Sequence, residues 1–359
     1  MFKLCYVIVG FLALLESSYS QEAQRSFTSR VDVLLESYFE KGKLNGDILI
    51  AVDGQEIYHR AWGYVNMVTE AELDSMSVFG LASVSKIFTS SALHLLEQRG
   101  EISLQSSIRV FFPELPAVYE PVTIYHMLSH TSGIPRNPGS WQNLVGRTNQ
   151  DILEFLMAQK ALEFVPGSAY QYCNYAFVLL AMLVERVSNL SFADFLEKEL
   201  FQKAGMKHSF AIRWEQEENY YRERERLGLV HSYVNGKRAD WPLYTYGPGG
   251  VCATAKDLLR WDRAVFSQRI FTQEQLERIL RPVQVRGEDQ HYGLGWGVLD
   301  AGGERIVGHT GGMFGFRILY EHQIQSGVTL IIMGNIGDDM PLMEIRSELL
   351  RVLIESIRG

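Results

Sequence analysis

The sequence predicts an α/β protein in which both ends of the chain build one domain and a helical second domain is inserted between them. Short β-type runs occur near both ends of the 359-residue chain, and the signals between them are mainly helical. The chain is also longer than one compact core usually accommodates. We therefore expect residues 21–120 and 245–359 to form the α/β domain and residues 121–244 the helical insertion, with a cleft where the two meet.

Residues 1–20 have the pattern of a signal peptide. Lys3 precedes an apolar run that is shorter than the roughly 20 residues of a membrane span, and small residues follow it up to Ser20. The pattern predicts a secreted or periplasmic protein whose mature chain begins near Gln21. Charged residues interrupt every later apolar stretch before it reaches that length, so we expect no stable membrane span.

The α/β domain is predicted to begin with a helix and a hairpin. Apolar side chains between Val31 and Tyr38 recur at helical spacing. Residues 46–65 contain two β-type runs separated by Asp53-Gly54, a dipeptide typical of a two-residue hairpin turn.

Helical signals fill the middle of the chain, and strands with a final helix follow them. The helical segments are 124–129, 150–160, 175–188 and 191–203. Both charges crowd segment 215–226, which we interpret as solvated surface. The later β-type runs are 292–299, 305–312, 314–322 and 327–335. A helix is expected from about Pro341, with one face made by the apolar positions 342, 345, 349, 352 and 353.

The composition indicates a globular protein without a nucleic-acid partner. Hydrophobic residues make up 47% of the chain, which is too many for a disordered protein, and the net charge is -8, which does not suit a polyanionic ligand. Beyond the predicted signal peptide only Cys173 and Cys252 remain. Export permits one disulfide between them, and the sequence leaves their pairing open.

Ser83 and Lys86 form the first candidate catalytic pair. If a helix begins near Ser83, their spacing of three residues places both side chains on one face, about one turn apart. A serine hydroxyl becomes a nucleophile when a base takes its proton, and an amine is a base only when its surroundings lower its pKa. The alternative is a serine that caps the helix beside an exposed lysine.

Tyr172 and Asn174 form the second candidate pair, between a Pro-Gly turn and an apolar helix. A tyrosine deprotonated by a nearby lysine charge can act as a general base, and an asparagine amide can bind a substrate amide and hold a lysine in place. The alternative is that Asn174 only caps the helix and Tyr172 is a packed aromatic residue.

A glycine-rich run supplies the third candidate element. His309, Thr310 and Gly311 are expected to end a strand, and Gly312 follows them. Glycine allows a substrate backbone to approach a strand edge, where the Gly312 N–H is a candidate oxyanion donor. The alternative is an ordinary Gly-rich hairpin turn.

Together and in this order, Ser-x-x-Lys, Tyr-x-Asn and His-Thr-Gly resemble the serine β-lactamase and penicillin-binding superfamily. Within it, the chain is similar to the class C β-lactamase-related branch, which includes D-amino-acid peptidases, such as D-alanyl-D-alanine peptidases, and carboxylesterases. The supporting motifs are "MLSHTSGIP" at 127–135, "GGVCATAKDLLRW" at 249–261 and "YGLGWGV" at 292–298. The similarity covers roughly residues 31–357.

The resemblance implies a fold and an acyl-serine mechanism. The implied fold is an antiparallel sheet flanked by helices, with an all-helical inserted domain, as in β-lactamases and transpeptidases. Ser83 would be acylated after activation by Lys86, and Tyr172 would exchange protons with the serine, the leaving group and water. Asn174, His309, Thr310 and Gly311 would bind substrate, and the N–H groups of Ser83 and Gly312 would form the oxyanion hole. Neither a cofactor nor a metal is implied.

His309 departs from the resemblance, because class C β-lactamases and most penicillin-binding proteins have lysine there. Lysine supplies a permanent cation for a substrate carboxylate, whereas histidine supplies a conditional one. We therefore expect hydrolysis of small-molecule esters or D-amino-acid peptides and amides in preference to β-lactams. The alternative function is a non-catalytic protein that binds peptidoglycan fragments or a partner in the same cleft.

Several other residues have competing interpretations. His126 and His130 have the spacing of a helical metal pair, but Glu does not follow His126 as in zinc proteases, so we favour a turn. Cys173 is expected to support the site rather than act as a nucleophile. Thr254 and Asp257 are expected to form a capping box with a structural role.

Overall fold

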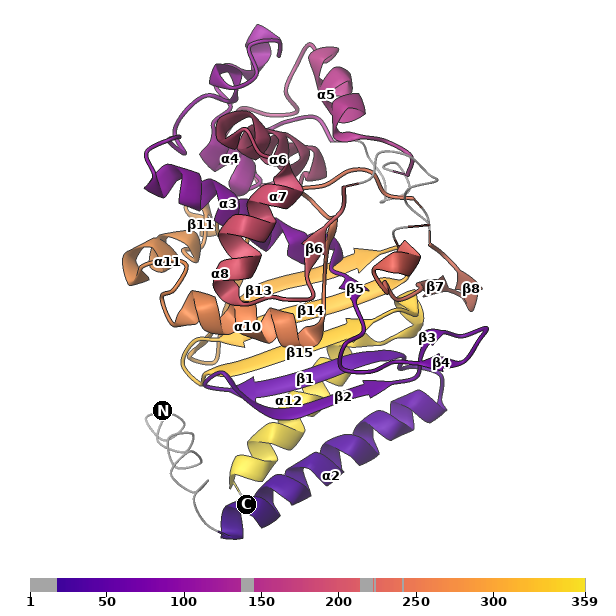
Figure 1. Cartoon of the computed structure of the whole chain (residues 1–359). Helices are drawn as coiled ribbons and strands as arrows, with labels where there is room; N and C mark the ends of the chain where they lie inside the picture. The colour runs from indigo at the N-terminus through magenta and orange to yellow at the C-terminus, as the bar shows by residue number, and fades with distance from the viewer. Residues whose placement is uncertain (1–17, 137–144, 214–221, 223, 241, 359) are drawn as a thin grey trace.

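The computed structural model describes residues 18–136, 145–213, 222, 224–240 and 242–358. Its centre is a 6-stranded antiparallel sheet with the strand order β12-β13-β14-β15-β1-β2 (Figure 1). The strands are β1 (Gly46–Val52), β2 (Gln55–Trp62), β12 (Gly297–Ala301), β13 (Glu304–Met313), β14 (Phe316–Gln323) and β15 (Val328–Gly334). Because β1 pairs with β15 along its whole length, the two ends of the chain build one sheet, as predicted.

The predicted hairpin is present and its turn explains the register. Asp53 and Gly54 have φ values of 48° and 71°, the left-handed backbone that two-residue hairpin turns require. The β-type run at 292–299 is a strand only from Gly297, where β12 begins. Tyr292 precedes it in a glycine-rich turn that packs against the helices, so the prediction was wrong for this part of the run.

Helices α2 (Ser18–Glu40) and α12 (Leu342–Arg358) cover one face of the sheet (Figure 1). The apolar stripes predicted for both helices are confirmed, because the buried side chains of this layer include Val31, Leu35, Tyr38, Ile345, Leu349, Val352 and Leu353. Helix α2 starts earlier than the stripe suggested, within the end of the predicted signal peptide. The rest of that peptide, residues 1–17, lies outside the described residues.

The opposite face of the sheet carries α10 (Ala255–Phe266) and, beyond it, the other helices (Figure 1). These are α3 (Ser85–Gln98), α4 (Ile124–Leu128), α5 (Asn149–Met157), α6 (Asn174–Ser188), α7 (Phe192–Leu196), α8 (Gln202–Ala204) and α11 (Gln273–Ile279). The four predicted middle helices are confirmed, although the last is divided by a π-helical turn, Glu197–Phe201, between α7 and α8.

The segment 121–244, predicted as entirely helical, also contains short strands. Within 121–244 lie β6 (Phe210–Ala211), β7 (Tyr233–Val234) and β8 (Lys237–Arg238). Strand β6 joins β9 (Val251–Ala253) and β5 (Phe79–Gly80) in a 3-stranded sheet. Strands of two residues are too short to show the alternation by which a strand is recognised. The remaining short strands are β3 (Tyr64–Asn66), β4 (Ala71–Glu72), β10 (Gln284–Val285) and β11 (Glu288–Asp289).

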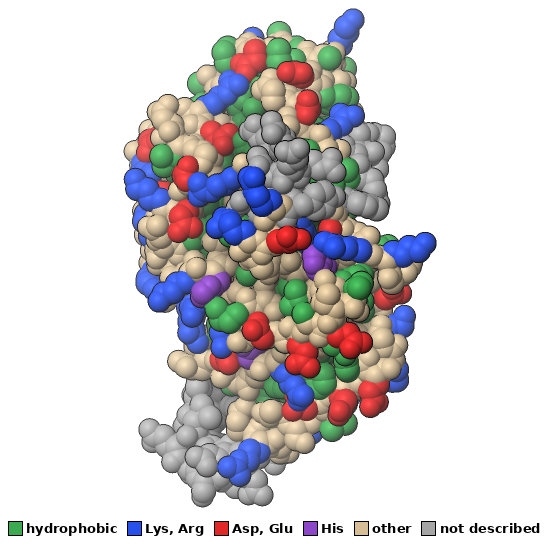
Figure 2. All heavy atoms as spheres, turned by 45° about the vertical axis from the view of Figure 1, so that its right-hand side comes forward, with side chains coloured by type: hydrophobic (Ala, Val, Ile, Leu, Met, Phe, Trp, Pro, Cys, Tyr) green, Lys and Arg blue, Asp and Glu red, His purple; other side chains and the backbone are tan. Residues whose placement is uncertain are grey.

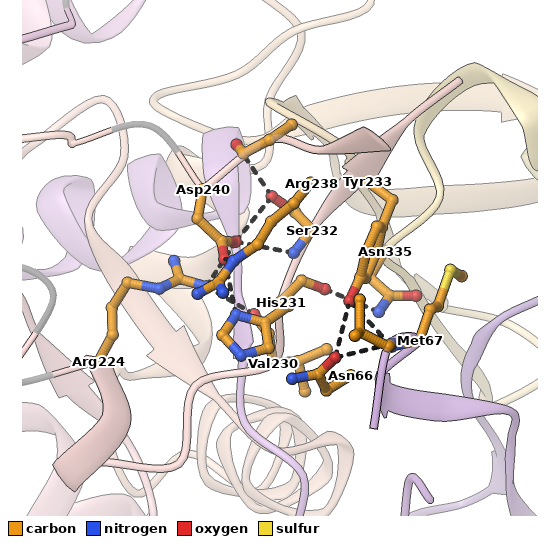
Figure 3. A network of polar contacts seen from close by, with 12 residues as sticks. Asn66, Met67, Arg224, Val230, His231, Ser232, Tyr233, Arg238, Asp240 and Asn335 are labelled. Atoms are coloured by element: carbon orange, nitrogen blue, oxygen red, sulfur yellow. Dashed lines mark hydrogen bonds and ion pairs between the residues drawn. The ribbon is translucent and has the colours of Figure 1, made fainter. Parts of the chain in front are cut away.

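A buried ionic network stabilises the region after the charged segment 215–226 (Figure 3). Most of that segment lies outside the described residues, but Arg224 is only 3% exposed, so the prediction of solvated surface was wrong for this side chain. Asp240 accepts hydrogen bonds from Arg224 at 2.8 Å, His231 at 2.6 Å and Arg238 at 2.5 Å. Burial alone would raise the pKa of Asp240, but these partners, His231 foremost, lower it well below its ordinary value.

The surface charge and the length of the helices concern possible nucleic-acid and membrane partners. Acidic and basic side chains are interspersed over the face shown in Figure 2. Within the described part of the chain, no single helix is long and apolar enough to cross a membrane. One pair bent by 77°, Asn174–Ser188 with Phe192–Ala204, meets the same criterion by length and composition.

Candidate active site

Ser83 lies in a tight turn that leads into α3. Residues Ala82–Val84 form a 3₁₀ turn, so α3 starts at Ser85, two residues later than expected. Ala82 has φ 49°, a left-handed conformation that costs a residue with a Cβ roughly 1–2 kcal/mol. This left-handed residue directly precedes Ser83 in the middle of the turn, and the turn packs beside strand β13.

Lys86 is positioned to take the proton of Ser83. Its Nζ lies 3.1 Å from Ser83 Oγ, as the spacing of three residues predicts, and donates a hydrogen bond to the carbonyl of Pro248 at 2.9 Å. The lysine is 0% exposed, and burial lowers its pKa well below the ordinary value. An uncharged amine has a free electron pair, so Lys86 can act as the base. The alternative of an exposed lysine beside a capping serine is wrong.

The segment 247–251 holds α3 in place against the site. Thr89 donates a hydrogen bond to the Gly247 carbonyl at 2.7 Å, and the N–H of Val251 donates to the Ser85 hydroxyl at 3.0 Å. Gly247 has φ 105°, and a Cβ there would lie 2.3 Å from the carbonyl oxygen of Phe177 in α6. A glycine is therefore needed where this segment passes α6.

Tyr172 lies over the lysine, but in a different protonation state from the one expected. Lys86 Nζ is 4.8 Å from the centre of the Tyr172 ring, and Ser83 is close enough to affect the pKa of Tyr172. Burial raises the pKa of Tyr172 well above its ordinary value. The sequence suggested a phenolate stabilised by a lysine cation. Burial instead favours a neutral phenol, which can relay protons as a hydroxyl group.

Asn174 is the first residue of α6 and presents an unsatisfied acceptor. Cys173 occupies the N-cap position, so the alternative of Asn174 as helix cap is wrong. The Oδ1 atom of Asn174 is buried and has no hydrogen-bond partner among the described residues. A buried acceptor without a partner is costly, which suits an atom that bonds to a substrate N–H.

The third motif lies within β13, which continues to Met313, rather than at its end. Strand β12 pairs with β13 only as far as Gly308, so the edge that carries the motif is not paired with β12. Gly311 permits close packing, because a Cβ there would lie 2.4 Å from the Leu81 carbonyl oxygen. The Thr310 side chain is exposed, and alternation along the strand directs it away from His309. The oxyanion role of Gly312 stays a prediction.

His309 is uncharged and is bonded within the protein. Its Nδ1 lies 2.6 Å from the Thr310 carbonyl oxygen, and its Nε2 lies 3.2 Å from the Tyr292 hydroxyl. Burial, followed by the proximity of Lys86, lowers the pKa of His309 to about 3. The conditional cation considered from the sequence is therefore absent at neutral pH.

The two histidines at helical metal spacing have separate structural roles. Helix α4 ends at Leu128, and His130 has φ 57°, so the two rings do not share a helix face. His126 accepts the N–H of Thr123, and His130 accepts the N–H of Cys173 at 3.1 Å. In the described ranges, no group of three or more His, Cys, Asp or Glu side chains is arranged to hold a metal ion.

The cysteines and the cap of α10 have structural roles as well. Cys173 and Cys252 are both buried and free, which answers the question left open by the sequence. Burial raises the pKa of Cys173 to about 11, which argues against a thiolate nucleophile. Thr254 caps α10, but the Asp257 carboxylate does not complete the capping box. It accepts a hydrogen bond from the backbone N–H of His208 instead.

Sequence reasoning missed Pro248 and Tyr292. Tyr292 begins the motif at 292–298 and Pro248 directly precedes the motif at 249–261, but neither shows a periodicity or spacing that indicates its contact. The Pro248 carbonyl reaches Lys86 across 162 positions of the chain, and Tyr292 reaches His309 across 17. Only the folded arrangement reveals these contacts.

A small hollow lies between β5, β9 and the end of β13. Its lining includes the apolar side chains of Ile212, Leu243, Met313 and Phe316, together with the charged side chains of Arg224 and Asp240. The candidate catalytic residues are not part of this lining, so we assign the hollow no role in the reaction.

The fold and the site define a serine hydrolase that forms an acyl-serine intermediate. The family model described as Beta-lactamase matches residues 31–352, and the chain belongs to this family. Penicillin-binding protein 4* of Bacillus subtilis (strain 168) is 32% identical over 336 residues, which cover 86% of this chain and 72% of that protein.

Further relatives have related names and folds. A D-aminopeptidase of Brucella anthropi is 28% identical over 309 residues, which cover 81% of this chain and 56% of that enzyme, so this chain spans little more than half of it. The structure of D-amino acid amidase from Ochrobactrum anthropi SV3 complexed with L-phenylalanine amide superposes with a TM-score of 0.77. It is 20% identical, and the match covers 93% of this chain and 100% of that one, which shows a common fold.

Proposed function

We propose that the protein is an exported hydrolase of small esters and D-amino-acid amides or peptides, and that β-lactams are poor substrates. The observation that carries this proposal is the buried Lys86, whose Nζ lies 3.1 Å from Ser83 Oγ and whose pKa is lowered by burial. The names of two relatives, a D-aminopeptidase and a D-amino acid amidase, agree with this substrate class. The signal-peptide pattern of residues 1–20 is the basis for proposing export.

The two chemical steps follow from the arrangement of the site. Ser83 Oγ attacks the substrate carbonyl while its proton passes to Lys86 Nζ. The Tyr172 hydroxyl, close to Ser83, relays this proton to the leaving group as the carbonyl–leaving group bond breaks. Water then attacks the acyl-serine, its proton returns through the same groups to the Ser83 oxygen, and the carboxylic acid leaves.

His309 favours substrates that have no carboxylate over β-lactams. A penicillin and a D-alanyl-D-alanine terminus both carry a carboxylate, which a permanent cation at this position would attract. A neutral imidazole whose two nitrogens are already bonded within the protein supplies no such charge. Asn174 Oδ1 remains as an acceptor for an amide N–H, which favours peptides and amides among the carbonyl substrates.

Steady-state hydrolysis by the mature protein tests the proposal. The substrates are a short-chain p-nitrophenyl ester, D-alanine p-nitroanilide, a D-Ala-D-Ala peptide and nitrocefin, each with wild type and Ser83→Ala. We expect the ester and the anilide to be preferred, with a loss in the variant of about 10⁴-fold or more. Mass spectrometry should detect the acyl adduct on wild type only.

Two results would contradict the proposal. Faster turnover of nitrocefin than of the ester and the anilide would reverse the substrate preference. Equal rates for both proteins, with no adduct, would favour the non-catalytic binding protein. N-terminal sequencing after expression with export tests the signal peptide, and we expect a mature chain that begins near Gln21.

A further inference from the structure

The His309 ring is held by two partners whose chemistry determines its tautomer. The Thr310 carbonyl oxygen can only accept, so Nδ1, 2.6 Å from it, must carry the hydrogen. A neutral ring then has its electron pair on Nε2. The Tyr292 hydroxyl, 3.2 Å from Nε2, must therefore donate to it.

Tyr292 is itself fixed by its surroundings. The side chain is 5% exposed, and its ring lies 4.8 Å from the ring of His130, 6.3 Å from Tyr172 and 6.1 Å from Tyr170. It meets the His309 ring edge-on at 90°. Because these rings enclose it, the Tyr292 side chain cannot move its hydroxyl away from His309 without displacing another aromatic ring.

The groups around His309 show why the Tyr292 hydroxyl matters for this ring. The titratable groups that face His309 are Lys86, His130, Tyr172 and Tyr292. Burial lowers the pKa of Lys86 and of His130 and raises the pKa of both tyrosines, so it disfavours the charged form of all four groups. The Tyr292 hydrogen bond occupies the one nitrogen of His309 at which a proton would bind.

We propose that Tyr292 is a positioning residue that fixes His309 in the Nδ1–H tautomer and thereby disfavours leaving groups that carry a carboxylate. With the Tyr292 hydroxyl donating to Nε2, that nitrogen carries no hydrogen that a carboxylate could accept. Without that donor, the neutral ring can carry its hydrogen on Nε2 and donate it to a carboxylate. The substrate part of this inference rests on the proposed function, and the tautomer part does not.

Nitrogen NMR of the imidazole rings tests the tautomer part with Tyr292→Phe, which keeps the ring and removes the hydroxyl. Tyr170→Phe is the matched control, because Tyr170 packs on Tyr292 and His130 in the same cluster. We expect a single Nδ1–H tautomer of His309 in wild type and in the control. In Tyr292→Phe we expect a mixture of tautomers and a protonation midpoint at higher pH. An unchanged His309 signal in Tyr292→Phe would overturn the inference.

Kinetics test the substrate part with the same three proteins. The measurement is the ratio of kcat/KM for D-alanine p-nitroanilide to that for D-Ala-D-Ala, followed from pH 5 to pH 8. In Tyr292→Phe, a new hydrogen bond of about 1 kcal/mol from Nε2 to the dipeptide carboxylate should lower this ratio roughly fivefold throughout this pH range, mainly through KM for the dipeptide. Equal losses for both substrates in Tyr292→Phe would indicate a merely structural residue and overturn the exclusion. If wild type hydrolyses neither substrate, the proposed function fails, while the NMR result still decides the tautomer.

Discussion

Gly311→Ala is expected to displace the turn that carries Ser83. A Cβ at this position would lie 2.4 Å from the Leu81 carbonyl oxygen and 3.2 Å from Ala82 Cβ. The first contact is with backbone, which cannot rotate aside as a side chain can. To reach ordinary van der Waals separation, the Leu81 carbonyl has to move by roughly 1 Å, and Ser83 is only two residues away.

The size of the effect follows from that displacement. Overpacking of this kind typically costs about 1–3 kcal/mol of folding free energy. A misplacement of the nucleophile by about 1 Å typically lowers the rate roughly 10²-fold. Since Lys86 and the aromatic cluster are untouched, the loss is expected mainly in kcat.

Gly312→Ala is the matched control for this variant. Its Cβ would meet the Arg317 guanidinium at 3.3 Å, the flexible end of a side chain, and the N–H of residue 312 is retained. The assays are ester hydrolysis and thermal unfolding of wild type and both variants. Wild-type kcat and stability in Gly311→Ala, or equal losses in both variants, would refute the packing argument.

Two further predictions concern buried charge. Lys86→Met should abolish activity and raise the stability at pH 7, because in wild type the unfolded chain binds a proton on Lys86 that the buried site disfavours. This gain in stability should disappear as the pH rises toward about 10, where the lysine of the unfolded chain also loses its proton. Chemical denaturation at several pH values measures it. Asp240→Asn should cost about 3–5 kcal/mol at pH 7, because it removes the buried carboxylate that pairs with Arg224. Because the pKa of Asp240 is lowered in the folded protein, the stability that its charge contributes is complete above about pH 4 and is lost as the pH falls further. The difference in unfolding free energy between wild type and Asp240→Asn should therefore shrink in acid, and a constant difference would contradict this.

The sequence determined those features that depend on near neighbours in the chain. The pairing of Ser83 with Lys86 follows from the helical repeat, because three residues nearly complete one turn. The Asp53-Gly54 hairpin and the apolar stripes of α2 and α12 follow from local periodicity in the same way. Even the union of both chain ends in one sheet was predictable, because the strand signals occurred at the two ends.

Only the tertiary structure decided the protonation states and the contacts between distant segments. Whether Lys86 is a base, Tyr172 a phenol and His309 a neutral ring depends on desolvation, which the surrounding segments produce together. The bond from Tyr292 to His309 joins residues on different segments and is created when the turn before β12 packs beside β13. A linear sequence specifies which groups are present, whereas their charge at neutral pH is a property of the packed site.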